Sequence, residues 1–305
     1  MFRSIKFKLI AYFTIIVIVI SLGLGAMNIF RSLDALKSTI DEELIELSKS
    51  YSDYISTEIT NAETIIDGIA NRNVIKSWDW NQQKKAIEYE IARNDIFSGM
   101  MIVDKNGNAR AEDGEVINVS SRKYFEAALK DKFYFSTLIY SNTTEKYQFF
   151  VSAPIKNNNK VTGAVVGIVD EDYLNKSIEK ISIGDNGGAF IIDNVGKVMA
   201  HSDHAVFEKK ENLIEVSLKN DDMKELGNVV QNMIAGKIAT QEYTLGGENY
   251  YCGYHPIGNT GWSLAIRAPF KELYAGSFRL INESILLGIL GVFIAIVCTY
   301  TFGSK

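Results

Sequence analysis

This chain has few cysteines and no excess of positive charge, and each of these two features excludes a class of protein. Its 305 residues include two cysteines. Cys298 lies in an apolar run near the C-terminus and Cys252 in the polar middle of the chain, so we expect no disulfide between them. The formal net charge of −5 argues against a nucleic-acid partner. The hydrophobic content, 47% of all residues, is that of a folded protein and not of a disordered one.

The motifs of common catalytic sites are also missing. The sequence has no Gly-x-Ser-x-Gly elbow, no His-Glu-x-x-His pair and no kinase signature. The pair Gly246-Gly247 indicates a hairpin turn, because no Lys-Ser or Lys-Thr follows it as a phosphate-binding loop would require. His201, Asp203 and His204 have a spacing that gives only weak support for a metal site. We therefore expect no enzymatic activity, no metal and no other cofactor, with a membrane-anchored surface enzyme as the alternative.

Two long apolar runs without charged residues lie towards the two ends of the chain. They cover Leu9 to Phe30 and Ser284 to Phe302, and about 20 apolar residues are enough for a helix to cross the hydrocarbon core of a bilayer. We predict transmembrane helices over residues 9–30 and 280–302. A cleaved signal peptide is the alternative for the first run, but that run is longer than a typical signal core and no convincing cleavage site follows it.

The orientation in the membrane follows from the basic residues before the first run. Arg3, Lys6 and Lys8 precede it with no acidic residue among them, and basic residues beside a membrane segment tend to stay in the cytoplasm. Residues 1–8 and 303–305 are therefore expected to be cytoplasmic, and the large polar segment between the runs extracytoplasmic.

The segment that follows the first run is patterned as one long helix. Its apolar residues recur at steps of three and four, and no proline or glycine interrupts them before Gly68. We predict a stalk helix over residues 31–72. Its apolar stripe can pack on its own domain and can also pair with a second copy, so we expect a homodimer.

An internal repeat divides the rest of the extracytoplasmic segment. Residues 99–111 (GMMIVDKNGNARA) recur as residues 188–200 (GAFIIDNVGKVMA), with five identical positions. Each copy has the Asp-x-x-Gly centre typical of a tight turn between two strands. In each half a Pro-Ile pair then leads to a further hairpin, whose last strand starts with Thr-Gly.

The repeat predicts an α+β fold made of two copies of one module, in which helices cover an antiparallel sheet. The first module is expected over residues 73–176 and the second over residues 177–279. The second module should lie nearer the membrane, because it leads directly into the second apolar run.

Three stretches resemble the double Cache sensor, a tandem of PAS-like modules. Residues 196–203 are similar to its G-x-V-x-A-H-P-D stretch, residues 254–264 to its Y-x-P-I-x-x-T-G-W hairpin, and residues 121–125 to its R-x-Y-F turn. The resemblance implies two tandem PAS-like Cache modules on a long N-terminal helix, flanked by two transmembrane helices. It also implies a chemoreceptor of the methyl-accepting chemotaxis type in a bacterial cell membrane.

A receptor of this family would bind a small extracellular ligand in its membrane-distal module and relay the signal across the membrane. A HAMP relay and a transmitter would follow the second crossing, and neither is found in this chain, which we expect to be a fragment of a longer receptor. The same outer architecture also belongs to histidine kinases and diguanylate cyclases. A stand-alone, membrane-anchored binding protein is a further alternative.

The resemblance places the ligand beside the R-x-Y-F turn, which here is Arg122, Tyr124 and Phe125. Ser120 or Ser121 is expected to cap a helix from Tyr124 to Lys130. An arginine can hold a carboxylate through two parallel charge-assisted hydrogen bonds. The aromatic residues of the turn, with Tyr140, would form walls of the site.

The amino-acid-binding subgroup of the family has a pattern that this chain matches only in part. Arg122 and Tyr140 agree with it, whereas Ile117 replaces a tyrosine, Tyr124 replaces a tryptophan and Phe125 lacks a hydroxyl.

The acid that would bind the ligand's amino group falls at Ile168, and Asp170, two residues further on, is the available substitute. The sequence therefore favours a small carboxylate or another small polar metabolite over an amino acid.

Overall fold

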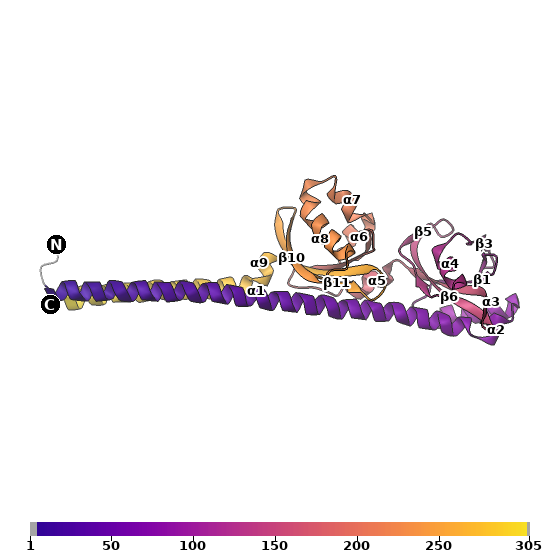
Figure 1. Ribbon diagram of the computed structural model, residues 1–305, viewed down its shortest axis with the longest axis horizontal. Coiled ribbons are helices and arrows are strands. Elements are labelled where there is room, and N and C mark those ends of the chain that lie inside the picture. Colours follow the sequence, from indigo (N-terminus) through magenta and orange to yellow (C-terminus); the bar gives the residue numbers. More distant parts are fainter. Residues whose placement is uncertain (1–4, 304–305) are drawn as a thin grey trace.

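One helix of 66 residues, α1 (Ile5–Ala70), forms the axis of the molecule. The structure is a computed structural model that describes residues 5–303. Helix α1 covers the first apolar run and continues without a break to Ala70, two residues before the predicted end of the stalk, and both sheets lie along its C-terminal half (Figure 1). Helix α10 (Ala275–Gly303) returns beside the N-terminal half of α1, so the two described ends of the chain lie together (Figure 1). The α+β class and the long N-terminal helix are thus confirmed.

The sheet farther from the paired helices α1 and α10 is called the distal sheet. It has seven strands, in the order β3-β2-β1-β7-β6-β4, with β5 also paired to β6. All its pairs are antiparallel. The strands are β1 (Gly99–Asp104), β2 (Asn108–Ala111), β3 (Val116–Asn118), β4 (Tyr134–Phe135), β5 (Ile139–Ser141), β6 (Lys146–Asn157) and β7 (Lys160–Asp170).

The sheet nearer the paired helices is called the proximal sheet. It has five strands, in the order β10-β11-β12-β8-β9, and is also antiparallel. The strands are β8 (Gly188–Ile192), β9 (Val198–His201), β10 (Ala239–Leu245), β11 (Glu248–Ile257) and β12 (Trp262–Pro269).

Short helices connect and cover the two sheets (Figure 1). Helices α2 and α3 precede the distal sheet, and α4 packs on its outer face, the face that points away from α1. Helix α5 joins the two sheets, and α6 to α8 cover the proximal sheet. Their bounds are α2 (Asn73–Lys76), α3 (Trp80–Arg93), α4 (Lys123–Leu129), α5 (Asp172–Ile178), α6 (His204–Lys209), α7 (Leu213–Ser217), η1 (Asp221–Met223), α8 (Lys224–Ile234) and α9 (Phe270–Leu273).

The internal repeat forms equivalent hairpins in the two sheets. Asp104 Oδ1 accepts the N–H groups of Asn106 and Asn108, at 2.8 and 2.9 Å. Asp193 Oδ1 does the same for Val195 and Lys197, at 3.0 and 2.9 Å. The glycines of the two turns have φ angles of 85° and 86°, which residues with a side chain rarely adopt. The turn chemistry expected from Asp-x-x-Gly is therefore confirmed in both copies.

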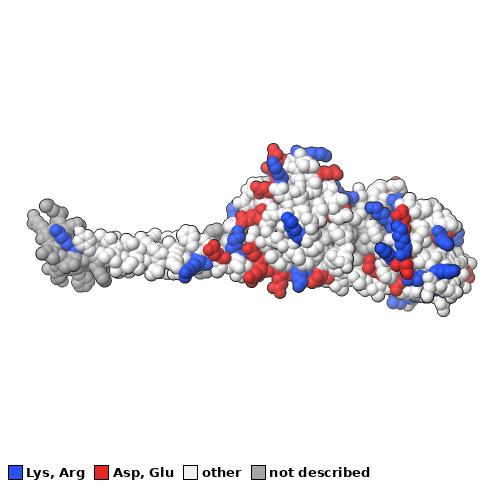
Figure 2. Space-filling view, in the orientation of Figure 1, with Lys and Arg blue, Asp and Glu red and all other residues white. Residues whose placement is uncertain are grey.

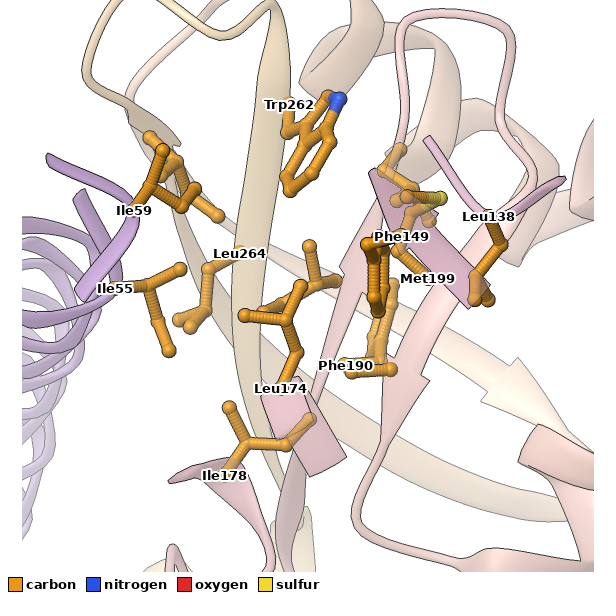
Figure 3. Packing of buried hydrophobic residues seen from close by; sticks show 14 of the residues in the cluster. Ile55, Ile59, Leu138, Phe149, Leu174, Ile178, Phe190, Met199, Trp262 and Leu264 are labelled. Carbon is orange, nitrogen blue, oxygen red and sulfur yellow. The ribbon is translucent and has the colours of Figure 1, made fainter. Parts of the chain in front are cut away.

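A continuous hydrophobic core joins α1 to both sheets (Figure 3). Ile55 and Ile59 of α1 point toward Leu264 of the proximal sheet, and Phe149 of the distal sheet and Phe190 of the proximal one belong to the same buried cluster (Figure 3). The indole of Trp262 on β12 meets two rings of the distal sheet, Phe135 at 5.8 Å and Phe149 at 6.2 Å between centroids. Because these residues are buried together, the sheets and the helix pack as one body.

One of the two predicted membrane segments meets the length and composition of a membrane span in the described residues. It lies in the N-terminal part of α1, where the apolar side chains are exposed. In α10 only a shorter apolar stretch, Ile285–Ile294, is found among the described residues. Figure 2 shows a slender rod of low charge where the two helices run together, with the charged residues gathered over the sheets. The second crossing stays a prediction.

Candidate functional site

A cavity of about 290 Å³ lies on the outer face of the distal sheet. Its floor comes from β1 and β7, and its walls come from the chain between β2 and α4 and from β5 with the loop after it. The lining residues are Met101, Ala111, Glu112, Asp113, Glu115, Ile117, Asn118, Val119, Arg122, Tyr124, Ile139, Tyr140, Ser141, Asn142, Thr143, Thr144, Phe150 and Ile168.

Three of the five residues expected from the sequence line this cavity, namely Arg122, Tyr124 and Tyr140. Phe125 does not, because it is buried beneath α4 in the hydrophobic cluster of the outer face. Asp170 does not line it either, since it is exposed at the end of β7, where it pairs with Gln148 of β6. Phe125 and Asp170 are thus outside the set of residues that face the cavity.

Arg122 lies at the N-terminus of α4, at the edge of the cavity. It is the N-cap residue in an extended conformation, with no capping side chain. The expected serine cap is wrong, because the hydroxyl of Ser120 donates to Asn118 instead, at 2.6 Å. Gly107 lets this loop approach the sheet, because a Cβ there would lie 2.8 Å from the Cα of Ser120. The Arg122 side chain is exposed and makes no ion pair or hydrogen bond with the other described residues, so its guanidinium is available to a ligand.

Tyr124 forms an aromatic wall that is tied to the sheet. Its ring stacks on Phe150 of β6 at 5.0 Å, and its carbonyl accepts the hydroxyl of Ser152 at 2.7 Å. Burial raises the pKa of its phenol to about 12, although the charge of Arg122 opposes the rise. The phenol is therefore un-ionised at neutral pH and can donate a hydrogen bond. Tyr140 is 46% exposed and stands against the ring of Tyr147, so it forms the open side of the cavity.

Glu112 is a charged cavity residue that was not predicted from the sequence. Its Oε2 accepts the N–H of Met100 at 3.2 Å, which holds the carboxylate over the start of β1. Its Oε1 lies 3.1 Å from the point where Gly99 would carry a Cβ, and Cδ1 of Ile168 lies 3.2 Å from that same point. The carboxylate therefore occupies the neighbourhood of Ile168, the position at which the expected acid is missing.

The residues that line the cavity carry a net negative charge. Glu112, Asp113 and Glu115 line it against one arginine, Arg122. Asp113 Oδ1 also accepts the N–H of Glu115 at 2.8 Å, which closes the turn that carries all three acids. A ligand with only negative groups would meet this acidic wall, whereas a ligand with a positive group would be attracted to it.

The histidines considered for a metal do not converge. The buried ring of His201 accepts the N–H of Asp203 at Nδ1, at 2.8 Å, while Nδ1 of His204 lies 3.5 Å from Glu208. Among the described residues there is no group of three His, Cys, Asp or Glu side chains that could hold a metal ion.

A comparison with protein families decides the classification. The family model of the Cache domain matches residues 32–277. This chain belongs to the Cache domain family. The match covers α1 from just after the first apolar run, both sheets and the start of α10, so the cavity lies inside a Cache domain.

This Cache chain is similar to a methyl-accepting chemotaxis protein. It is 21% identical over 212 residues to the methyl-accepting chemotaxis protein PscA of Pseudomonas syringae pv. tomato, covering 67% of this chain and 33% of PscA. The chain thus spans about one third of that relative's length.

Solved Cache structures share the fold. The ligand-binding domain of the Pseudomonas fluorescens chemoreceptor CtaA, in complex with L-isoleucine, superimposes with a TM-score of 0.64 at 15% identity, covering 81% of this chain and 99% of that one. The extracellular domain of the putative histidine kinase mmHK1S-Z3 does so with a TM-score of 0.63 at 14% identity, covering 78% and 97%.

Proposed function

We propose that the chain is the sensor part of a bacterial membrane receptor and that its distal cavity binds a small molecule carrying both a carboxylate and an amino group. The observation that supports this most directly is that Arg122 and Glu112, which carry opposite charges, both line one cavity. The distal module would comprise residues 73–176 and the proximal module residues 177–279.

The two charges suit the two ends of such a ligand. The guanidinium of Arg122 can bind a carboxylate through two parallel hydrogen bonds. The carboxylate of Glu112, already fixed by the N–H of Met100, leaves an oxygen for an ammonium group. Asp113 and Glu115 add negative charge on the same wall, which opposes a ligand of purely anionic character.

This proposal refines the expectation of a simple carboxylate. The sequence argued against an amino acid because Ile168 replaces the expected acid, yet Glu112 brings a carboxylate beside Ile168 from the end of β2. The structural neighbour CtaA, which is described in complex with L-isoleucine, supports the same ligand class. An α-amino acid is therefore the first ligand to test.

The long helix suits a relay across the membrane. α1 is continuous from the first apolar run to the distal sheet, and α10 follows directly from the proximal sheet. Ligand binding would shift these two helices relative to each other in a homodimer, with residues 280–302 as the second crossing and both ends in the cytoplasm. A chemotaxis output is favoured by the likeness to PscA. A histidine kinase output is the second candidate, because the domain of mmHK1S-Z3 has the same fold.

Thermal unfolding of the full chain in lipid nanodiscs tests the ligand class. L-amino acids should raise the unfolding temperature through Arg122. Any rise caused by the matching carboxylates without an amino group, such as 3-methylpentanoate for L-isoleucine, should be the same in the wild type and in Arg122→Ala. Arg122→Ala should remove the rise caused by L-amino acids, and Lys123→Ala, which deletes the neighbouring exposed charge outside the cavity, should keep it. Equal rises with L-amino acids in the wild type and in Arg122→Ala would overturn the proposed site.

A further inference from the structure

The proximal sheet carries a second cavity, of about 280 Å³, beneath α6, α7, η1 and α8. Strand register shows that it occupies the same place in its module as the distal cavity. In the distal sheet Gly99 pairs with Ile168 and Met101 with Ala111. In the proximal sheet Gly188 pairs with Arg267 and Phe190 with His201.

Three equivalent sheet positions therefore line both cavities. In the distal cavity they hold Met101, Ala111 and Ile168, and in the proximal cavity Phe190, His201 and Arg267. The apolar isoleucine of the first module is thus replaced by a cation in the second. We propose that the proximal cavity is a separate ligand site, which takes a small carboxylate with an apolar chain and holds it through Arg267.

Arg267 is pre-positioned for such a ligand by two tyrosines. Its Nη1 donates to the hydroxyl of the buried Tyr243 at 3.2 Å, and its guanidinium lies 4.8 Å from the ring centroid of Tyr250. The two rings stack on each other at 5.5 Å. These contacts fix the plane of the guanidinium and use few of its five N–H donors.

The charge of Arg267 has no close counterpart in the protein. Its side chain is half-buried, and no described carboxylate lies within the 4 Å of an ion pair. The charge of Asp203 acts on Arg267 from outside the cavity lining, and Oδ1 of Asp203 accepts the N–H of Ala205 at the start of α6. A partly buried cation without a paired anion is unfavourable, so a bound carboxylate would supply the missing interaction.

His201 adds a neutral donor beside the arginine. Because its Nδ1 accepts the N–H of Asp203, the ring proton lies on Nε2. Burial and the charge of Arg267 lower the pKa of His201 to about 4, so the ring is neutral at physiological pH. The ring also stacks on Phe190 at 5.9 Å, which holds it at the cavity wall.

The remaining lining explains why the ligand should be apolar apart from its carboxylate. The helices contribute Val206, Leu213, Val216, Met223 and Leu226, against one acid, Glu211, and one further cation, Lys209. The cavity volume is just below the usual range of small-molecule sites, about 300–1,000 Å³. A carboxylate of roughly four to eight heavy atoms in total is therefore a reasonable probe. The balance of charge is opposite to that of the distal cavity, which has three acids and one arginine.

Methionine methyl NMR on the full chain in nanodiscs can separate the two sites, because Met223 lines the proximal cavity and Met101 the distal one. Methyl-¹³C methionine is incorporated, and 3-methylbutanoate is titrated against 3-methylbutylamine. The carboxylate should shift the Met223 signal saturably and leave the Met101 signal unchanged. The amine should not shift the Met223 signal.

Arg267→Met should weaken this titration at least tenfold, while Lys219→Ala, which removes an exposed charge near the cavity, should leave it unchanged. If the methionine variant does not fold, Arg267→Lys is the second variant. It keeps the positive charge but lacks the parallel N–H donors of the guanidinium, so it should weaken binding less than Arg267→Met. No saturable Met223 shift, an equal shift with the amine, or unchanged binding in the folded variants would overturn the proposal. Because Met101 reports on the distal cavity separately, failure of one site would not be mistaken for failure of the other.

Discussion

Glu112 and Ile168 meet at one point beside Gly99, although they come from different edges of strand β1. Glu112 Oε1 and Ile168 Cδ1 lie 3.1 and 3.2 Å from the place that a Cβ of Gly99 would fill. Glu112 comes from the turn after β2, and Ile168 from β7, and β1 pairs with both strands. A negative charge can therefore reach the same part of the cavity from either side.

This arrangement predicts that Glu112→Gln weakens the binding of an α-amino acid about tenfold, because a neutral amide replaces one end of a charge-assisted hydrogen bond. Isothermal titration on the full chain in nanodiscs measures the change. Glu126→Gln, on the exposed side of α4 and outside the cavity, is the matched control and should bind as the wild type does.

The double variant Glu112→Gln with Ile168→Asp should recover most of the lost affinity. The new aspartate would place its carboxylate from β7 where Glu112 places its own from β2. Unaltered affinity in Glu112→Gln, or no recovery in the double variant when its fold is intact, would contradict the assignment of Glu112 to the amino group.

Stability should fall in acid because of His201. Its pKa is lowered from 6.5 to about 4 by burial and by Arg267, so the unfolded chain binds a proton that the folded chain does not between these values. The free energy of unfolding should therefore fall as the pH falls from 6.5 toward 4, by about 3 kcal/mol from this group. His201→Asn keeps an acceptor for the N–H of Asp203 but cannot titrate, so its loss of stability over this range should be smaller. Urea unfolding at several pH values gives the slope, and identical slopes in both proteins would refute the role of His201.

The sequence was sufficient to predict the features that depend on local pattern. The uninterrupted apolar stripe after residue 30 predicted the long helix, and the two Asp-x-x-Gly centres predicted turns whose aspartates accept the same backbone N–H groups. The start of α4 was predicted less well, because Ser120 prefers Asn118 to the helix N-terminus and leaves Arg122 as the cap residue.

Features that depend on register across strands were not predictable in the same way. Counting from the Thr-Gly pair at the start of each last strand aligns Ile168 with Ile266, but the ladders pair Ile168 with Gly99 and Arg267 with Gly188. The register shift in the β6–β7 ladder at Ile155/Lys156 shows why counting from the turn fails. Glu112 was missed for a similar reason, since its approach to Ile168 exists only once both strands flank β1.

The stalk is attached to the proximal sheet through Asp41. Its carboxylate accepts the hydroxyls of Thr240, at 2.5 Å, and of Tyr251. Asp41→Asn should lower the stability of this contact by about 1–2 kcal/mol, because hydrogen bonds to a charged acceptor exceed those to a neutral one. Hydrogen exchange should then be faster in residues 37–45 of α1. Glu43→Gln, an exposed change on the same helix, should leave the exchange as it is, and equal protection in the two variants would contradict the prediction.

Trp262 of the proximal sheet packs against two aromatic rings of the distal sheet. It is 3% exposed and contacts Phe135 and Phe149 with its indole. Trp262→Ala should lower the free energy of unfolding by about 3–5 kcal/mol, because it removes a large buried side chain and leaves a cavity at the junction of the sheets. Circular dichroism during urea unfolding measures the loss. Leu218→Ala, at a residue that is 80% exposed, is the control and should change stability by no more than about 0.5 kcal/mol. A similar stability for Trp262→Ala and the control would show that the sheets do not depend on this contact.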